Sequence, residues 1–184
     1  MPAGETAAAR SFEQVVLPHL DAAYNLARWL AGDPATAEDI VQDAVLRALQ
    51  YFASFRGEGD GRAWLLRIVR NTAYAALRAR RAGQSVPLDA GANAEGEGAV
   101  ALAVPDPAPG PEAMLALRQD LEQLERALAA LPIELRECLV LCEIEQLSYK
   151  DIARVTEVPV GTVMSRLWRA RQALLRLKLA DPVR

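Results

Sequence analysis

The chain has 184 residues, 52% of them hydrophobic, and a formal net charge of −3. This length allows one or two small domains, and a composition rich in Ala and Leu with few aromatic residues favours helices. The sequence contains no run of 18 apolar residues that would predict a membrane span, and its N-terminus lacks the basic and apolar regions of a secretory signal. We therefore expect an all-α, cytoplasmic protein without direct membrane insertion.

Residues 11–81 are predicted to form a first helical domain. Hydrophobic periodicity favours helices over 12–31, 34–52 and 62–81. Asp33 is suited to cap the second of these helices, with Pro34 at its first helical position. A glycine-rich loop over 54–61 precedes the third helix.

The second predicted helix carries a polar and acidic stripe with a leucine in it. The stripe consists of Asp39, Gln42, Asp43 and Leu46. Such a stripe is typical of a surface that docks on another protein. An ordinary solvated face with one stray leucine is equally compatible with the pattern.

The third predicted helix has a basic face, because 61–81 holds six arginines and no acid. Arg67, Arg70, Asn71, Tyr74 and Arg78 share this face, and Phe55, Arg56 and Trp64 lie at or before the start of the helix. Arginines bind phosphates, and aromatic rings stack on unpaired bases. The surface therefore favours single-stranded or melted nucleic acid over an intact major groove, with a solvated basic face as the alternative.

Residues 82–111 are predicted to form a flexible linker. They are rich in Gly, Pro and Ala, contain four acids and no base, and show no helical or strand periodicity. The linker separates the first domain from a second helical domain at 112–179, with helices expected over 112–130 and 132–145.

The end of the second domain predicts a helix-turn-helix. Ser148 is placed to cap a short helix, a turn follows at 157–159, and a longer helix starts near Val160. One face of this longer helix is apolar, with Val163, Met164, Leu167, Ala170 and Leu174, and the other carries Thr162, Ser165, Arg166 and Arg169. A hydroxyl and guanidinium face of this kind suits the major groove of DNA, although a solvated basic face is again the alternative.

No catalytic or metal-binding pattern is found in the sequence. Cys138 and Cys142 lie one helical turn apart, which disfavours a disulfide, and no nearby residue completes a zinc site. His19 lies in an amphipathic helix and is expected to be structural. Because P-loop and GxSxG motifs are also missing, we expect no enzyme activity, metal, cofactor or small-molecule substrate.

Three stretches of the chain together resemble the extracytoplasmic-function (ECF, group 4) sigma factors, which direct bacterial RNA polymerase to promoters. Residues 37–49, AEDIVQDAVLRAL, are similar to region 2.2 of that family. Residues 55–81 resemble regions 2.3 and 2.4, and residues 131–174 resemble region 4. The resemblance implies two small helical sigma domains joined by the acidic linker.

The resemblance also implies a role for each predicted surface. The stripe of Asp39, Gln42, Asp43 and Leu46 would dock on the clamp helices of the polymerase's largest subunit. The basic-aromatic surface of the third helix would melt and read the minus-ten element of promoter DNA. The helix-turn-helix face would read the minus-thirty-five element. An anti-sigma factor is the expected regulatory partner, and the free protein is expected to have two semi-independent domains and low affinity for duplex promoter DNA.

Two residues depart from the family pattern. Ala75 stands where the family often has an Asp, and Glu157 stands where the turn of the helix-turn-helix usually has a Gly. Glu157 must therefore accept the backbone conformation of this turn, at about 1 kcal/mol if that conformation is left-handed.

Two other classes of protein fit the sequence less well. A helix-turn-helix repressor or activator would carry a ligand or phosphoacceptor domain in its first half, where none is found. An RNA-processing enzyme would need catalytic acids or metal ligands close to its basic faces, and both basic runs are free of acids.

Overall fold

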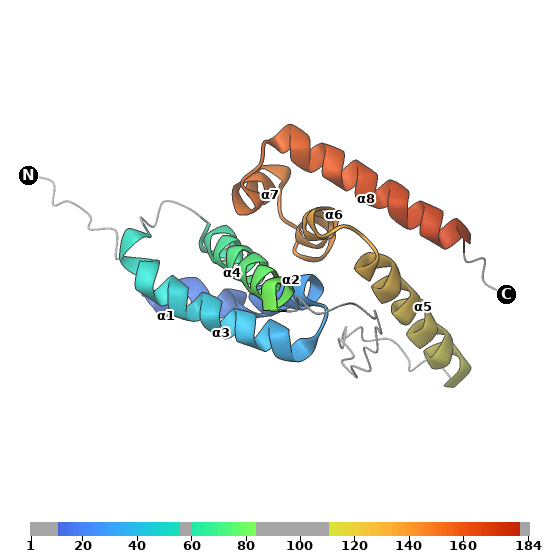
Figure 1. Cartoon of the computed structure of the whole chain (residues 1–184), viewed down its shortest axis with the longest axis horizontal. Coiled ribbons are helices and arrows are strands. Elements are labelled where there is room, and N and C mark those ends of the chain that lie inside the picture. Colours follow the sequence, from blue (N-terminus) through green and yellow to red (C-terminus); the bar gives the residue numbers. More distant parts are fainter. Residues whose placement is uncertain (1–10, 56–59, 84–110, 181–184) are drawn as a thin grey trace, which may run out of the picture.

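The computed structural model describes residues 11–55, 60–83 and 111–180, and every regular element in these ranges is a helix (Figure 1). The first domain contains α1 (Phe12–Val16), η1 (Leu17–His19), α2 (Leu20–Ala31), α3 (Pro34–Tyr51), η2 (Phe52–Ser54) and α4 (Gly61–Gly83). The second contains α5 (Pro111–Ala129), α6 (Ile133–Leu139), the π-helical turn η3 (Val140–Ile144), α7 (Tyr149–Thr156) and α8 (Val160–Ala180). The all-α prediction is confirmed. Arg56 and residues 84–110 of the predicted linker lie outside the described ranges.

The first predicted helix is divided in the structure into α1 and α2. Between them, Pro18 lies in the 3-10 turn η1. Proline lacks a backbone N–H and its ring clashes with the preceding helical turn, so it interrupts the α-helix. The prediction of one continuous helix over 12–31 was wrong at this point.

The start of α3 agrees with its predicted cap. The backbone N–H of Thr36 donates to Asp33 Oδ1 at 2.8 Å, and Pro34 occupies the first turn. The preceding Gly32 ends α2 in the left-handed conformation with φ of +86°, which glycine adopts at little steric cost. These two adjacent signals fix the reversal between α2 and α3.

The helix-turn-helix is formed by α7 and α8. The backbone N–H of Asp151 donates to Ser148 Oγ at 3.2 Å, as expected for the predicted cap. Glu157 ends α7 with φ of +57° and ψ of +37°, so the turn does place a residue with a Cβ in the left-handed region. α4 extends two residues past the predicted domain boundary at 81, and α5 includes Pro111 of the predicted linker.

The two domains pack against each other in this structure. α4 contacts α7, and α2 contacts α6 (Figure 1). Buried apolar side chains of both domains form one continuous cluster, from Val16 in α1 to Ala170 in α8. This arrangement differs from the two semi-independent domains that we expected. The contact could not be predicted from local sequence patterns, because it joins residues far apart in the sequence.

Two further properties concern the described residues alone. None of the helices in the described ranges is long and apolar enough to cross a membrane. Within the same residues, no group of three or more His, Cys, Asp and Glu side chains is placed to hold a metal ion.

Candidate functional site

The polar stripe of α3 is exposed on the first domain. Asp39, Gln42, Asp43 and Leu46 are all exposed, and Leu46 retains 59% of its accessible surface. The structure thus brings these four predicted residues together on one surface of α3.

An apolar groove of about 430 Å³ adjoins this stripe. It is lined by Phe12, Val16, Leu17, Leu20, Val41, Gln42, Val45 and Leu46. Gln42 and Leu46 belong to both the stripe and the groove, so the polar stripe continues into an apolar surface. Leu17, which is 56% exposed, also lines the groove and was not predicted from the sequence.

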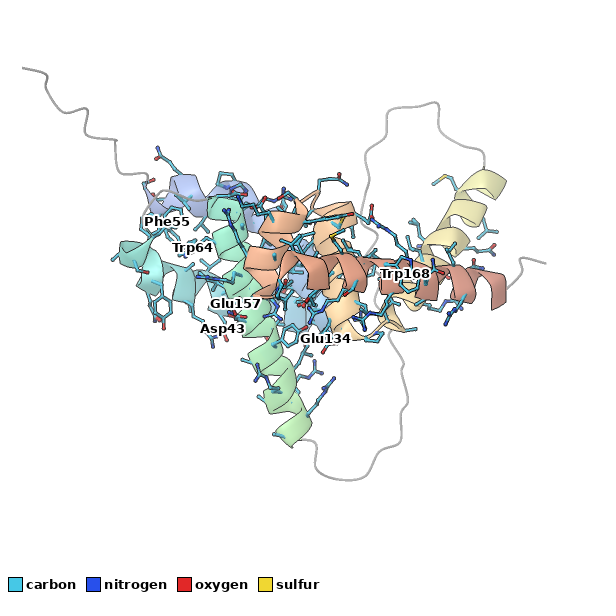
Figure 2. All side chains as sticks on the ribbon, turned by 90° about the horizontal axis from the view of Figure 1, so that it is seen from above. Asp43, Phe55, Trp64, Glu134, Glu157 and Trp168 are labelled. Atoms are coloured by element: carbon cyan, nitrogen blue, oxygen red, sulfur yellow. The ribbon has the colours of Figure 1, made fainter. Side chains whose placement is uncertain are left out.

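Aromatic rings gather between α1, the end of η2 and the first turn of α4. The Phe55 and Trp64 rings lie 4.9 Å apart between centroids (Figure 2), and Phe55 is stacked at 5.9 Å on Phe52. Phe12 packs edge-on against Phe52 at 5.4 Å. The structure therefore brings the predicted Phe55 and Trp64 together. The role predicted for Arg56 concerns a residue outside the described ranges.

The predicted basic face of α4 is formed, but its members differ in exposure. Arg67, Asn71 and Arg78 are exposed, whereas Arg70 and Tyr74 are partly buried. The Arg70 guanidinium lies 4.5 Å above the Tyr74 ring, a cation–π contact, and its Nη1 donates to Asn71 Oδ1 at 3.2 Å. Arg70 is thus held in place by neighbours on its own helix.

Part of this face is turned toward acids of the second domain. Arg70 Nε donates to Glu137 Oε2 at 2.8 Å, and Arg62 pairs with Glu145. Arg67 Nη1 lies 4.0 Å from Glu157 Oε1, where the turn of the helix-turn-helix approaches α4. We call these contacts the interdomain ion pairs: Arg62–Glu145, Arg67–Glu157 and Arg70–Glu137. None of the three ion pairs was predicted from the sequence, because each joins positions more than 60 residues apart.

Glu137 lies at the centre of this polar network. Its side chain is fully buried in α6, and it accepts bonds from Arg70 of the first domain and, at 3.1 Å, from Arg166 Nη1 of α8. A buried carboxylate requires such partners, since an unpaired buried charge costs several kcal/mol. Glu137 therefore connects one arginine from each predicted DNA-binding surface.

The network shifts the pKa values of its neighbours. Burial, followed by the negative charge of Glu137, raises the pKa of the Tyr74 hydroxyl above its ordinary range. Burial alone would lower the pKa of Arg70, but the hydrogen bond and charge of Glu137 outweigh it, so the pKa of Arg70 is raised. At neutral pH the phenol is therefore neutral and the guanidinium charged.

Both cysteines are free thiols. Cys138 is fully buried, and burial raises its pKa to about 11. Cys142, one turn further on, is partly buried. The burial agrees with the interpretation that these residues pack the helix.

The four residues of α8 that were predicted to contact DNA are not equally exposed. Ser165 and Arg169 are exposed and Thr162 is half-buried. Ser165 Oγ donates to the Thr162 carbonyl at 2.9 Å, and Arg169 Nε donates to the Ser165 carbonyl at 3.3 Å. Arg166 differs from them, because its side chain is only 17% exposed and pairs with Glu137.

The opposite face of α8 also departs from the prediction. Val163, Leu167 and Ala170 are buried as expected, but Met164 is 54% exposed. Trp168, one turn further along α8, is 63% exposed (Figure 2). The apolar arc assigned from helical periodicity was therefore too wide, because the core of this domain contacts a narrower strip of α8.

Comparisons with known proteins cover both domains. Residues 15–83 match the family described as Sigma-70 region 2, and residues 121–174 match Sigma-70, region 4. The chain is 38% identical over 168 residues to the RNA polymerase sigma-H factor of Pseudomonas aeruginosa, covering 90% of this chain and 84% of that protein. It is also 38% identical over 139 residues to the ECF RNA polymerase sigma-E factor of Escherichia coli (strain K12), covering 74% of this chain and 70% of the relative.

Two solved structures have the same fold. The sigma factor RpoE of Bartonella quintana, in complex with the anti-sigma factor NepR, has a TM-score of 0.70 at 29% identity, covering 92% of this chain and 98% of the other. CnrH, in complex with the cytosolic domain of CnrY, has a TM-score of 0.65 at 27% identity, covering 96% of this chain and 92% of the other.

The geometry of α8 predicts different effects for its two neighbouring arginines. Replacing Arg166 by Ala removes one partner of the buried Glu137, so it should lower the free energy of unfolding by about 1–3 kcal/mol. Replacing the exposed Arg169 by Ala should lower it by less than about 0.5 kcal/mol. Urea unfolding followed by circular dichroism measures both variants. Equal stability of the two would contradict a structural role for Arg166.

Proposed function

The chain belongs to the extracytoplasmic-function branch of the sigma-70 family, and from this premise we propose a function for each of its two domains. As a sigma factor, the protein binds core RNA polymerase and directs promoter-specific transcription initiation. The first domain, at residues 11–81, docks on polymerase and acts on the minus-ten element. The second, at residues 112–179, reads the minus-thirty-five element, and residues 82–111 link them.

The observation that carries this division is the separation of three surfaces on one chain. The exposed stripe of α3 and the basic-aromatic surface of α4 lie on different helices of the first domain. The helix-turn-helix lies in the second domain. One surface is suited to protein and two are suited to DNA, which supports a protein that connects polymerase to two promoter elements.

The α3 stripe is the proposed contact with core polymerase. Its acids offer charge complementarity to a basic partner, and Leu46 and the adjoining groove offer apolar area. Interfaces draw most of their binding free energy from a few such central side chains. The clamp helices of the largest subunit are the proposed partner of this stripe.

The surface of α4 and its preceding loop is the proposed minus-ten site. Phe55 and Trp64 provide rings for unpaired bases, and Arg67, Arg70 and Arg78 provide phosphate contacts. Asn71 and Tyr74 lie among these arginines and complete the site. Arg56 is included in this proposal from the sequence pattern.

The exposed side chains of α8 are the proposed minus-thirty-five site. Ser165 and Arg169 project from the helix near its start, the part that enters the major groove in helix-turn-helix proteins. Thr162 is placed one turn before Arg166. Because Arg166 is paired with Glu137, we assign base reading to Arg169 first, and to Arg166 only where it leaves this pair.

Control by an anti-sigma factor completes the proposal. The two structural relatives were solved as complexes, RpoE with the anti-sigma factor NepR and CnrH with the cytosolic domain of CnrY. Their similarity to the whole chain supports a comparable protein partner here. We further propose that the protein acts in the cytoplasm, where it has no catalytic activity, cofactor or small-molecule substrate of its own.

Charge reversal on the α3 stripe should impair polymerase binding. The double substitution Asp43→Arg with Leu46→Ala should weaken core affinity by at least about tenfold, because it removes an acid and an apolar anchor from one exposed surface. Fluorescence anisotropy with labelled protein and core polymerase measures this affinity. Asp21→Arg, at an exposed position of α2, makes the same charge change elsewhere and should leave the affinity unchanged. Native circular dichroism with unchanged core affinity in the double variant would refute the assignment.

Loss of the Phe55 ring should impair promoter melting more than promoter binding. A stacked base contributes about 1–3 kcal/mol, so Phe55→Ala should reduce open-complex formation about fivefold or more. Permanganate reactivity of unpaired thymines in the holoenzyme complex reports melting. Tyr51→Ala removes an exposed ring from the same part of the domain and serves as the control. Equal melting by Phe55→Ala and the wild type would show that this loop has another role.

A further inference from the structure

The arginines of α4 are not all free in this structure. Arg70 is bound at 2.8 Å to the fully buried carboxylate of Glu137. Arg62, in the first turn of α4, pairs with Glu145, whose side chain is 4% exposed. Asn25 Nδ2 of α2 also donates to Glu145 Oε1 at 3.2 Å. The first domain thus supplies the donors and the second domain the carboxylates.

These carboxylates occupy the donors that a phosphate would use. Guanidinium groups bind carboxylates and phosphates through the same N–H groups. Arg70 uses Nε and Nη2 toward Glu137, so it cannot present those donors to a nucleic acid at the same time. The second domain therefore occupies donors of α4 that a nucleic acid would otherwise contact.

The proposed polymerase-docking surface is not covered in the same way. Asp39, Gln42, Asp43 and Leu46 remain exposed while α4 is packed on α7. The same arrangement of the two domains thus leaves the protein-docking stripe open and occupies part of the DNA-binding surface.

We propose that the interdomain ion pairs form an autoinhibitory latch, in which Glu137, Glu145 and Glu157 take the place of DNA phosphates and keep the free protein from binding DNA before it docks on polymerase. The inference rests on the proposed role of α4 in DNA binding. It explains the acids of the second domain that face α4, which promoter reading does not require.

The latch opens without leaving a buried charge unpaired. When the domains separate, Glu137 keeps its bond to Arg166, because both residues belong to the second domain. Glu157 and Arg67 are half-exposed already, and the departure of α2 and α4 gives Glu145 access to water. Arg70 then becomes available to a phosphate. The ion pairs can therefore open without leaving a charge buried and unpaired.

The closed state lowers the apparent affinity for DNA. A ligand that binds only the open state has its apparent Kd multiplied by the inverse of the open fraction. Weakening the latch should therefore tighten DNA binding, although it adds no new DNA contact.

The test is binding of a fluorescein-labelled, 15-nucleotide single-stranded DNA to the whole protein without polymerase, measured by anisotropy. The latch variant is Glu145→Gln with Glu157→Gln, which removes two acids outside the proposed DNA-binding surfaces. Its control is Glu125→Gln with Glu143→Gln, which changes the net charge equally on exposed acids of the same domain. The latch variant should bind about tenfold more tightly than the wild type, and the control less than about twofold.

The outcomes separate the latch from the function on which it rests. Equal affinity of the two double variants would overturn the latch alone. No binding by any variant would overturn the assignment of α4 to DNA, and the latch with it. If circular dichroism shows the latch variant to be unfolded, the single variant Glu157→Gln, in an exposed turn, replaces it. That variant should bind about twofold to threefold more tightly than Glu143→Gln alone, and equal affinity would overturn the latch.

Discussion

The buried carboxylate of Glu137 constrains how the rest of this structure can be arranged. A charge without exposure to water is tolerated only when close donors compensate for its lost hydration. Here one donor comes from α8 of the same domain and one from α4 of the other domain. The first bond connects α6 to α8. The second bond connects the helix-turn-helix domain to the basic face of α4. It therefore links the position of one domain to that of the other.

Small side chains allow the helices of the first domain to pack closely. Alanines such as Ala23, Ala27, Ala44 and Ala73 are fully buried at the contacts of α2, α3 and α4. Gly61 continues this pattern at the start of α4, where a Cβ would lie 2.7 Å from Val15 Cγ1. A core of this composition leaves the larger polar side chains at the domain surfaces, where polymerase, DNA or the other domain can contact them.

Local features were predicted well from the sequence because they depend on local chemistry. Asp33 and Ser148 cap helices as expected, and Glu157 adopts the left-handed conformation that its turn requires. The errors concern long-range packing. Periodicity alone could not show that Met164 is exposed or that Arg166 faces a buried acid, since both depend on how α6 and α8 meet. The interdomain ion pairs could not be predicted either, because acids and arginines that are remote in sequence share no local pattern.

The central claim is that the acids of the second domain cover the arginines of α4 in the free protein, which requires the two domains to be packed together in solution. Small-angle X-ray scattering of the free, full-length protein tests this requirement most directly. The account predicts a pair-distance distribution with one maximum. A distribution with two maxima, as given by two separated domains, would contradict it.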